Sequence, residues 1–416
     1  MDTILKGKLL GINGLGRIGK LTLWYHLQAN YFDGFVINTG REIGKSLDDL
    51  LQVIETDSTY GTLDRFIYGF NGGKADVKIV DEKTPIISID GKMIKFLKKA
   101  RNPKDINWSN EAVRLVVDCT GNFVDPTASA DNPKGSLRGH IEAGAEKVIL
   151  SAPFKISDSS KKMPEDSAMF VYGINHPEFN PNKHNIISAA SCTTTGLAHM
   201  MKPLLEDKRT ADIVTASMST IHSMTNTQSI LDSVPKANAG DLRKSRAVSN
   251  NIILSTTGAA KALEYVLPQI KNIGFMADSV RIPTTTVSLI MLNVTFHTEL
   301  NDKAEPVINR NYINDIYKNA SESSQKNLLV FSERQNVSTD LIGVPAACVI
   351  EGHETHTRTG FLKLPANRLK SAGIDQSTDL EMPVTHAKIF GWYDNELGSY
   401  VHCLGKLTIY TYQQIH

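Results

Sequence analysis

The chain has 416 residues, more than one hydrophobic core usually organises, so we expect two domains. Hydrophobic residues make up 41% and charged residues 21%, as in ordinary folded proteins and unlike disordered chains. Lys and Arg number 45 against 44 Asp and Glu, and a net charge of +1 gives no overall field that would attract phosphate backbones or anionic lipid. Neither nucleic acid nor a membrane is therefore an expected partner.

A cytoplasmic location is expected from the first residues and from the four cysteines. Lys6 and Lys8 interrupt the stretch where a signal peptide needs apolar residues, and no run of 18 apolar residues occurs. The cysteines lie far apart with no C-x-x-C pair, which fits neither a disulfide scaffold nor a structural zinc site. The H-x-x-H of His353 and His356 lacks a third ligand, so no metal is expected.

The first 190 residues alternate apolar runs with helix-like stretches. Residues 9–12 form a short apolar run, a Gly-rich turn follows, and apolar residues then recur at helical spacing from Ile18 to Leu27. Residues 35–38, 114–121 and 147–151 are near-continuous apolar runs, typical of parallel strands buried on both faces. This alternation predicts a Rossmann-type, doubly wound α/β parallel sheet.

The Gly-rich turn has the spacing G-x-G-x-x-G between a predicted strand and a predicted helix. Without side chains at these positions, a pyrophosphate can approach backbone N–H groups at the helix N-terminus. An ordinary tight turn is the other interpretation, but a second strand ends about 20 residues later, where such folds contact the adenosine ribose. The expected cofactor-binding residues of the turn are Gly14, Gly16, Arg17, Ile18 and Gly19.

The end of the second strand indicates which dinucleotide binds. Asn38 is followed by Thr39, Gly40 and Arg41, with no acid to repel a 2′-phosphate. The Arg41 guanidinium can pair with such a phosphate, or it can be a solvated loop cation. Asn38, Thr39 and Arg41 are therefore expected cofactor-binding residues, and we expect NADP or NAD as the cofactor, with a lean towards NADP.

After about residue 190 the pattern changes. Residues 213–221 and 280–296 are rich in β-branched side chains with a period close to two, which predicts long antiparallel strands. We expect an α+β catalytic domain with a mainly antiparallel sheet. Residues 351–386 carry Gly, Pro, Thr and charged side chains without clear periodicity, so we interpret much of this segment as a loop or insertion.

One cysteine and one histidine are candidates for chemistry. Cys192 precedes apolar residues at helical spacing and is expected at a helix N-terminus, where the dipole favours a thiolate. Ser191, Thr193 and Thr194 supply hydroxyl groups that can cap the helix or hold an anion. His222 ends a predicted strand and can act as a base, although an inert core cysteine and a satisfied histidine are the plainer alternatives. The other cysteines are interpreted as structural: Cys119, Cys348 and Cys403.

Six motifs together resemble the phosphorylating glyceraldehyde-3-phosphate dehydrogenase family, in their residues and in their order. They are GINGLGRIG at 11–19, SCTT at 191–194, TIH at 220–222 with Thr225 after it, TGAAK at 257–261, RIP at 281–283 and WYDNE at 392–396. The resemblance covers most of residues 7–350 and 386–416. A dinucleotide-binding domain is then expected at 1–190, completed by a C-terminal helix at about 396–416. The catalytic domain is expected at 191–395, with an insertion at about 351–386.

The resemblance implies that Cys192 is the nucleophile, His222 its base and Asn395 the contact to the nicotinamide carboxamide. In the implied reaction, the thiolate adds to the aldehyde of glyceraldehyde 3-phosphate, and His222 accepts a proton and, as an imidazolium, raises the thiolate fraction. Hydride transfer to NAD(P) leaves a thioester that phosphate converts to 1,3-bisphosphoglycerate, in glycolysis or gluconeogenesis. The further implied cofactor-binding residues are Thr120 and Ser151, and the implied anion-site residues are Ser191, Thr193, Thr225, Thr257, Gly258 and Arg281.

The resemblance also implies the partners: a phosphorylated aldehyde, inorganic phosphate and, in a homotetramer, other copies of the chain. Three positions depart from the family's pattern, with Thr195 for Asn, Gly196 for Cys and Leu397 for an aromatic residue. None of them removes a reacting group. Two alternatives stay open. Erythrose 4-phosphate dehydrogenase would share nearly all the motifs, and a catalytically silent scaffold would keep the fold without turnover.

Overall fold

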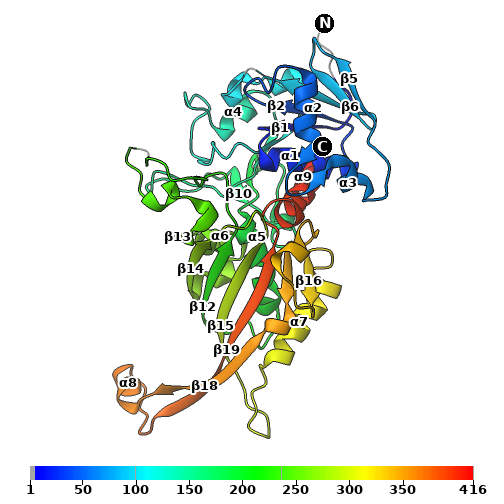
Figure 1. Cartoon of the computed structure of the whole chain (residues 1–416). Coiled ribbons are helices and arrows are strands. Elements are labelled where there is room, and N and C mark those ends of the chain that lie inside the picture. Colours follow the sequence, from blue (N-terminus) through cyan, green and yellow to red (C-terminus); the bar gives the residue numbers. More distant parts are fainter. Residues whose placement is uncertain (1–4, 99, 236, 416) are drawn as a thin grey trace. The chain divides into compact units, whose positions relative to one another are not determined.

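The computed structural model describes residues 5–98, 100–235 and 237–415 (Figure 1). The chain divides into two compact units. Unit 1 comprises Met1–Cys192 and Glu396–His416, and unit 2 comprises Thr193–Asn395. Within the described ranges, no helix has both the length and the apolar composition needed to cross a bilayer.

Unit 1 is built on a nine-stranded sheet with the order β10-β11-β9-β8-β1-β2-β7-β6-β5. The strands from β10 to β7 in this order are parallel, and β6 and β5 complete the sheet in antiparallel pairing. Their bounds are β1 Leu9–Asn13, β2 Gly34–Asn38, β5 Val77–Asp81, β6 Ile86–Ile89, β7 Lys92–Leu97, β8 Leu115–Asp118, β9 Lys147–Leu150, β10 Ser167–Met169 and β11 Ile186–Ser188. A separate hairpin pairs β3 Thr56–Asp57 with β4 Gly61–Thr62. The predicted doubly wound, mostly parallel sheet is confirmed.

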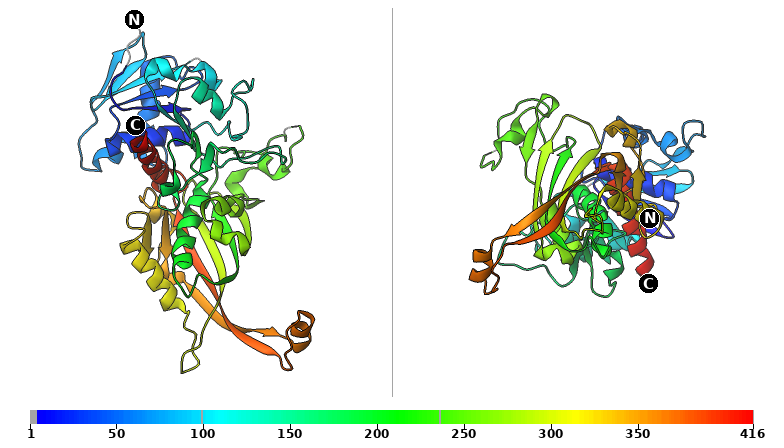
Figure 2. Two further views of the ribbon diagram at one scale, coloured as in Figure 1. Left: turned by 180° about the vertical axis from the view of Figure 1, so that it is seen from behind. Right: turned by 90° about the horizontal axis from the view of Figure 1, so that it is seen from below.

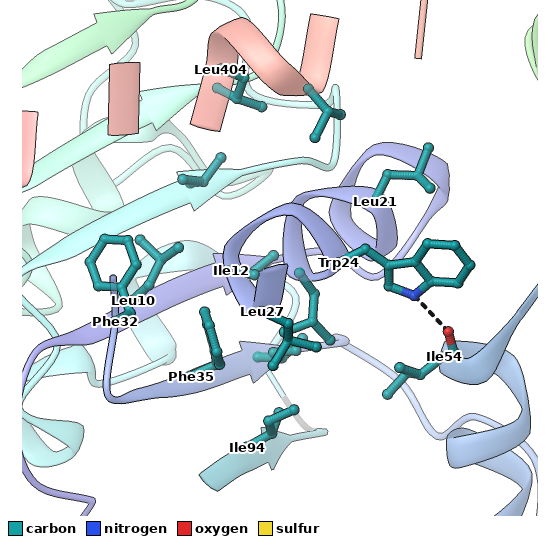
Figure 3. Packing of buried hydrophobic residues seen from close by; sticks show 14 of the residues in the cluster. Leu10, Ile12, Leu21, Trp24, Leu27, Phe32, Phe35, Ile54, Ile94 and Leu404 are labelled. Carbon is teal, nitrogen blue, oxygen red and sulfur yellow. Dashed lines mark hydrogen bonds between the residues drawn. The ribbon is translucent and has the colours of Figure 1, made fainter. Parts of the chain in front are cut away.

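Apolar side chains cover both faces of this sheet, because successive residues of each parallel strand point to opposite sides. Leu10 and Ile12 of β1 join one cluster, whereas Leu9 joins the other. Helices of the first face include α1 and α9, and Figure 3 shows Leu404 of α9 in the same cluster as Leu10. The helices of this face are α1 Arg17–Ala29, α2 Leu47–Glu55, α3 Leu63–Tyr68, the π-helical turn Leu397–Val401 and α9 His402–Gln414; the other face has α4 Leu137–Glu142 and the 3₁₀ turns Pro103–Asp105 and Trp108–Glu111.

Unit 2 contains an eight-stranded, mainly antiparallel sheet, as predicted, with the order β13-β14-β12-β15-β19-β17-β16 and with β18 paired to β19. Its strands are β12 Ile213–His222, β13 Ile253–Ser255, β14 Gly274–Arg281, β15 Ser288–His297, β16 Leu329–Ser332, β17 Cys348–Glu351, β18 His356–Leu364 and β19 Leu380–Tyr393. Its helices are α5 Cys192–Glu206, which begins in unit 1, α6 Ala259–Val266, α7 Arg310–Glu322 and α8 Ala366–Ser371.

One detail of the predicted strands is wrong. Residues 280–296 do not form one strand, because β14 ends at Arg281 and β15 begins at Ser288. Pro283 lies in this gap and has no N–H to donate to a ladder. In addition, β14 runs parallel to β12, and only β15 is antiparallel to it.

The two faces of the eight-stranded sheet differ in burial. Along β15, residues alternate between buried and half-exposed. The buried side faces α5, since a Cβ added at Gly196 would lie 3.3 Å from Ile290, and α7 lies behind it, with the Tyr317 hydroxyl donating to Met200 O at 2.8 Å. We call the other side the open face, and its apolar residues include Ile221, Leu254, Met276, Val280, Leu289, Met291, Phe390 and Trp392.

The prediction that residues 351–386 are largely loop is wrong. β18 and β19 form an antiparallel ribbon from the pair His356 and Lys388 to the pair Leu364 and Leu380, and α8 lies in their connection. β15 stops pairing with β19 at Val384, so the end of the ribbon leaves the sheet, as Figures 1 and 2 show. We call residues 356–386 the arm. Its free end is largely exposed, and apolar and polar side chains alternate only at residues 362–364 and 380–382, too short a run to mark a strand in the sequence.

Candidate active site

The turn after β1 leaves backbone groups accessible where side chains would block them. Gly14 has φ +93°, which favours glycine, and its N–H donates to Asn38 O at 2.8 Å. A Cβ at Gly19 would lie 1.9 Å from Gly14 O, so only glycine lets α1 approach the turn. No described atom lies within 4 Å of a Cβ built at Gly16, which caps α1 without a side-chain hydrogen bond. The free N–H groups of the first turn of α1 therefore fit a pyrophosphate.

Arg17 and Ile18 are the first two residues of α1. The Arg17 side chain is engaged within unit 1: Nε donates to Glu396 Oε1 at 3.1 Å, and Nη1 and Nη2 pair with Asp57 and Glu396. Lys20 also reaches Asp57 at 2.8 Å. Two carboxylates that sequence analysis missed thus hold the Arg17 guanidinium. The expected contact of Arg17 to the cofactor would therefore be made by its backbone N–H.

The end of β2 presents a polar edge. Asn38 is buried, and its Nδ2 donates to Asn13 Oδ1 at 2.8 Å and to Ala100 O at 2.9 Å. Its Oδ1 is also buried and has no hydrogen-bond partner among the described residues. A buried acceptor without a donor is costly, so this atom, together with the open glycine turn, fits a bound dinucleotide.

Two cations flank the loop that follows β2. Arg41 is exposed, and Thr39 Oγ1 donates to its carbonyl at 2.6 Å. Arg101 was not singled out from the sequence, but its Nε donates to Gly40 O at 3.3 Å, which holds its guanidinium beside the loop. No local motif marks Arg101, because it follows β7, about 60 residues later in the chain.

A buried carboxylate fixes the neighbouring residues of the turn. Asp118 Oδ1 accepts from Thr120 N and Oγ1 at 3.0 and 2.7 Å, and Asp118 Oδ2 accepts from Asn13 Nδ2 at 2.7 Å and from His140 Nε2 at 3.0 Å. Ser151 N donates to Asp118 O at 2.9 Å. Thr120 is thereby held against the turn, since a Cβ at Gly14 would lie 3.0 Å from its methyl group.

Cys192 is the first residue of α5, where the sequence places it, and it is half-buried beside the first core cluster of unit 1. The helix dipole there favours the thiolate. The other three cysteines have the opposite environment. Burial raises the pKa of Cys119 and of Cys403 to about 12 and raises the pKa of Cys348 as well, so all three remain thiols near neutral pH.

His222 ends β12 and lies opposite Arg281 of β14 in the parallel register. Its Nδ1 donates to Ser223 O at 2.8 Å, and this carbonyl also accepts from Arg281 Nη1 at 3.2 Å. Burial lowers the pKa of His222 to about 3, and the positive charge of Arg281 acts in the same direction. The imidazole is therefore neutral at pH 7, and because Nδ1 carries the proton, Nε2 has the lone pair.

Side chains from distant parts of unit 2 meet beside His222. The Tyr393 hydroxyl bonds to Thr193 Oγ1 at 2.9 Å and to Thr220 Oγ1 at 2.7 Å, and its ring meets the His222 ring edge-on at 6.0 Å. Tyr393 was missed as a site residue, although it lies in the WYDNE motif.

Asn395 is oriented by two serines that sequence analysis also missed. Its Oδ1 accepts from Ser223 Oγ at 2.8 Å and from Ser288 Oγ at 3.0 Å. Both lone-pair directions of the amide oxygen are therefore used, which leaves the amide NH₂ as the group that can donate to a ligand.

The remaining expected anion-site residues lie on separate elements. Thr225 follows β12 and is half-buried. Thr257 Oγ1 accepts from Ala259 N at 3.2 Å, and Gly258 caps α6 without a side-chain bond. Ser191 directly precedes α5. The described part of the chain contains no group of three or more His, Cys, Asp or Glu residues suited to a metal ion.

Comparison with known proteins identifies the family. Residues 8–126 match the model of the glyceraldehyde 3-phosphate dehydrogenase NAD binding domain, and residues 191–395 match the C-terminal domain of the same family. The first match supports NAD or NADP as the cofactor, and the open glycine turn is consistent with it.

Similar proteins span nearly the whole chain. Glyceraldehyde-3-phosphate dehydrogenase 2 of Streptomyces avermitilis is 34% identical over 406 residues, covering 98% of this chain and 99% of that protein. Glyceraldehyde-3-phosphate dehydrogenase 2 of Bacillus subtilis is 33% identical over 392 residues, 94% of this chain and 92% of its own. The chloroplastic glyceraldehyde-3-phosphate dehydrogenase A of Chlamydomonas reinhardtii is 34% identical over 391 residues, covering 94% of this chain and 85% of that protein. The chain therefore belongs to the glyceraldehyde-3-phosphate dehydrogenase family of NAD(P)-dependent oxidoreductases.

Proposed function

We propose that the chain oxidises glyceraldehyde 3-phosphate and captures the product with inorganic phosphate as 1,3-bisphosphoglycerate, in the cytoplasm and in glycolysis or gluconeogenesis. The observation that carries this proposal is the state of His222. A buried, neutral imidazole whose Nδ1 is bound to Ser223 O offers Nε2 as a base. In the other half of the reaction, Cys192 at the start of α5 is the nucleophile.

The Cys192 thiolate adds to the aldehyde carbon and forms a thiohemiacetal. His222 Nε2 accepts the hydroxyl proton as the carbon is oxidised, and a thioester remains on Cys192. NAD or NADP, when bound, supplies the hydride acceptor. Phosphate then attacks the thioester, releasing the acyl phosphate and restoring the thiolate, and His222 returns to its neutral form by passing its proton to solvent. Because the pKa of His222 is lowered to about 3, His222 is a neutral base before substrate binds and not an imidazolium paired with the Cys192 thiolate.

Two anions have to be held in this reaction, the substrate's phosphoester and the attacking phosphate. Arg281 is the one guanidinium among the expected anion-site residues, and Thr225 and Thr257 add hydroxyl groups. The Thr193 hydroxyl is buried and bonded to Tyr393. We therefore assign the anion contact of Thr193 to its backbone N–H in the first turn of α5, where helix N–H groups lack intrahelical acceptors.

Asn395 and the loop after β2 decide how the cofactor binds. The Asn395 amide NH₂ would donate to the nicotinamide carboxamide oxygen, because its own oxygen is occupied by Ser223 and Ser288. Thr39, Arg41 and Arg101 would surround the ribose 2′ position with one hydroxyl and two cations. We propose that both dinucleotides are used, with a preference for NADP.

A homotetramer is part of the proposal. Its support in the structure is the open face, where Leu254, Val280, Ile221 and Leu289 form one apolar row across four strands. Such a half-exposed row on a sheet is typical of a surface that another subunit covers.

Steady-state assays with purified protein test the function. We expect glyceraldehyde 3-phosphate to reduce NAD(P) in a phosphate-dependent reaction. Mass spectrometry of the mixture without phosphate should show an acyl adduct on Cys192. The Cys192→Ser variant should lose the adduct and the turnover while still binding the dinucleotide. A higher kcat/KM with erythrose 4-phosphate would favour the alternative dehydrogenase. Absence of any adduct would favour a scaffold.

A further inference from the structure

The arm carries an apolar face that the proposed reaction does not use. Leu362 and Met382 lie opposite each other in the ribbon, and Leu364 and Leu380 are the next pair on the same face. Leu362, Leu380 and Met382 are 41%, 38% and 37% exposed. These pairs lie beyond Val384, where β15 no longer supports β19.

The apolar face of such a ribbon is expected to pack against another surface. Beyond the sheet the two strands have only the short helix α8 with its buried Leu369 beside them, and a ribbon with so little further packing is marginally stable in water. Clustered exposed apolar side chains mark a contact surface. The second edge of β18 also has no strand partner among the described residues, which leaves its N–H and C=O groups available.

The charge of the arm excludes a polyanion as the covering partner. Its basic residues are Arg358, Lys363, Arg368 and Lys370, and its acidic residues are Asp375, Asp379 and Glu381. Lys363 and Glu381 neutralise each other at 2.8 Å on the opposite face from Leu362. A nearly balanced surface does not attract nucleic acid or anionic lipid, whose binding depends on excess positive charge.

The arm also continues an existing surface. Even-numbered residues of β19 point to the open face, from Phe390 in the sheet to Met382 and Leu380 in the arm. We propose that the apolar face of the arm packs against a second copy of this chain and extends the contact made by the open face. In a two-fold dimer each copy presents the same surface, so every arm contact occurs twice. This inference rests on the proposed homo-oligomer.

Sedimentation velocity over a range of protein concentrations, with the full-length chain, tests the proposal. The double variant Leu362→Ser, Met382→Ser removes one pair from the apolar face. We expect its dissociation constant between copies to rise about tenfold or more, which corresponds to at least about 1.4 kcal/mol. Phe361→Ser is the matched control, because Phe361 is 54% exposed but lies on the opposite face of the same strand. It should assemble like the wild type.

Hydrogen exchange supplies the second measurement. Amides of residues 361–364 and 380–382 should be protected in the assembled wild type and lose that protection on dilution or in the double variant, while the thermal midpoint of the monomer stays unchanged. Met291→Asp on the open face separates the two proposals. If it weakens assembly and the double variant does not, the arm proposal is wrong and the homo-oligomer stands. A wild type that is monomeric at all concentrations overturns both.

Discussion

The turn after β1 and the end of β12 build the two proposed binding sites by different means. The turn uses positions without side chains, since a Cβ at Gly19 would overlap Gly14 O and one at Gly16 would enter open space. The end of β12 uses buried polar side chains that fix one another, such as Tyr393 between Thr193 and Thr220. The first site should therefore be sensitive to any added atom, whereas the second should be sensitive to the loss of particular atoms.

The largest effect is expected at the end of β12, from His222→Asn. This change removes the Nε2 base but keeps a polar side chain, so kcat should fall by about 10²–10⁴-fold. Dinucleotide affinity should stay within about twofold, because the His222 base acts in the chemical step and not in binding of the dinucleotide. Stopped-flow oxidation and fluorescence titration of the dinucleotide measure the two quantities. An unchanged kcat would remove His222 from the chemistry.

Arg281→Leu should have the next largest effect and should depend on the substrate. Loss of a guanidinium that holds the phosphoester should lower kcat/KM for glyceraldehyde 3-phosphate by about 10²-fold, on the scale of a charge-assisted hydrogen bond in a protected site. Activity with unphosphorylated glyceraldehyde should change far less. Equal losses with both aldehydes would mean that Arg281 acts through Ser223 O and His222 instead.

Two substitutions in the glycine turn after β1 test whether this site is sensitive to added atoms. The Cβ added by Gly16→Ala has no described atom within 4 Å, so the thermal midpoint should hardly change. Dinucleotide affinity should fall about tenfold, because the methyl group enters the space expected for the pyrophosphate. Gly19→Ala should instead lower the thermal midpoint, because its Cβ would lie 1.9 Å from Gly14 O. Calorimetry of unfolding and of binding distinguishes the two, and equal effects would contradict the assignment.

Cofactor choice should shift by a smaller amount. Thr39→Asp introduces a carboxylate that repels a 2′-phosphate, so the NAD/NADP ratio of kcat/KM should rise by about tenfold. Arg41→Ala and Arg101→Ala should each weaken NADP and leave NAD nearly unchanged, because only NADP carries the paired phosphate. A wild-type preference for NAD above about a hundredfold would show that another group selects the cofactor.

The last effect concerns stability in acid and involves no binding site. His26 is fully buried in α1 against Tyr25 and Phe32, neither ring nitrogen has a partner among the described residues, and burial lowers its pKa to about 3. The unfolded chain takes up this proton below about pH 6.5, whereas the folded chain does not until far lower pH. The free energy of unfolding should therefore fall as pH drops below 6.5, by up to about 1.4 kcal/mol per pH unit for this residue.

His26→Leu should remove that contribution. We expect the thermal midpoint of the variant to decrease less than that of the wild type between pH 7.5 and pH 5, on the order of the slope above. His356→Gln serves as a control, since His356 is exposed in the arm. The same decrease in both variants would show that His26 does not govern the acid response.

The parts of the molecule that could be predicted from the sequence are those with local signals. Parallel strands such as 147–150 are near-continuous apolar runs, and the glycine turn is defined by spacing over six positions. The orientation of Asn395 could not be predicted, because it depends on Ser223 and Ser288, which are 172 and 107 residues away. The arm could not be recognised as strands because its alternation of apolar and polar side chains is confined to residues 362–364 and 380–382, too short a run for periodicity to stand out.

The pairing of Arg17 with Glu396 has a consequence for how the protein is made. Unit 1 begins with the first residues and is completed by the last ones, since Glu396 holds Arg17 and Leu404 fills the cluster around Leu10. Chains are synthesised from the N-terminus, and domains fold as units while they emerge. Unit 2 is continuous from Thr193 to Asn395, so it can be complete while unit 1 still lacks its final helix. The half of the chain that leaves the ribosome first is therefore the half that finishes folding last.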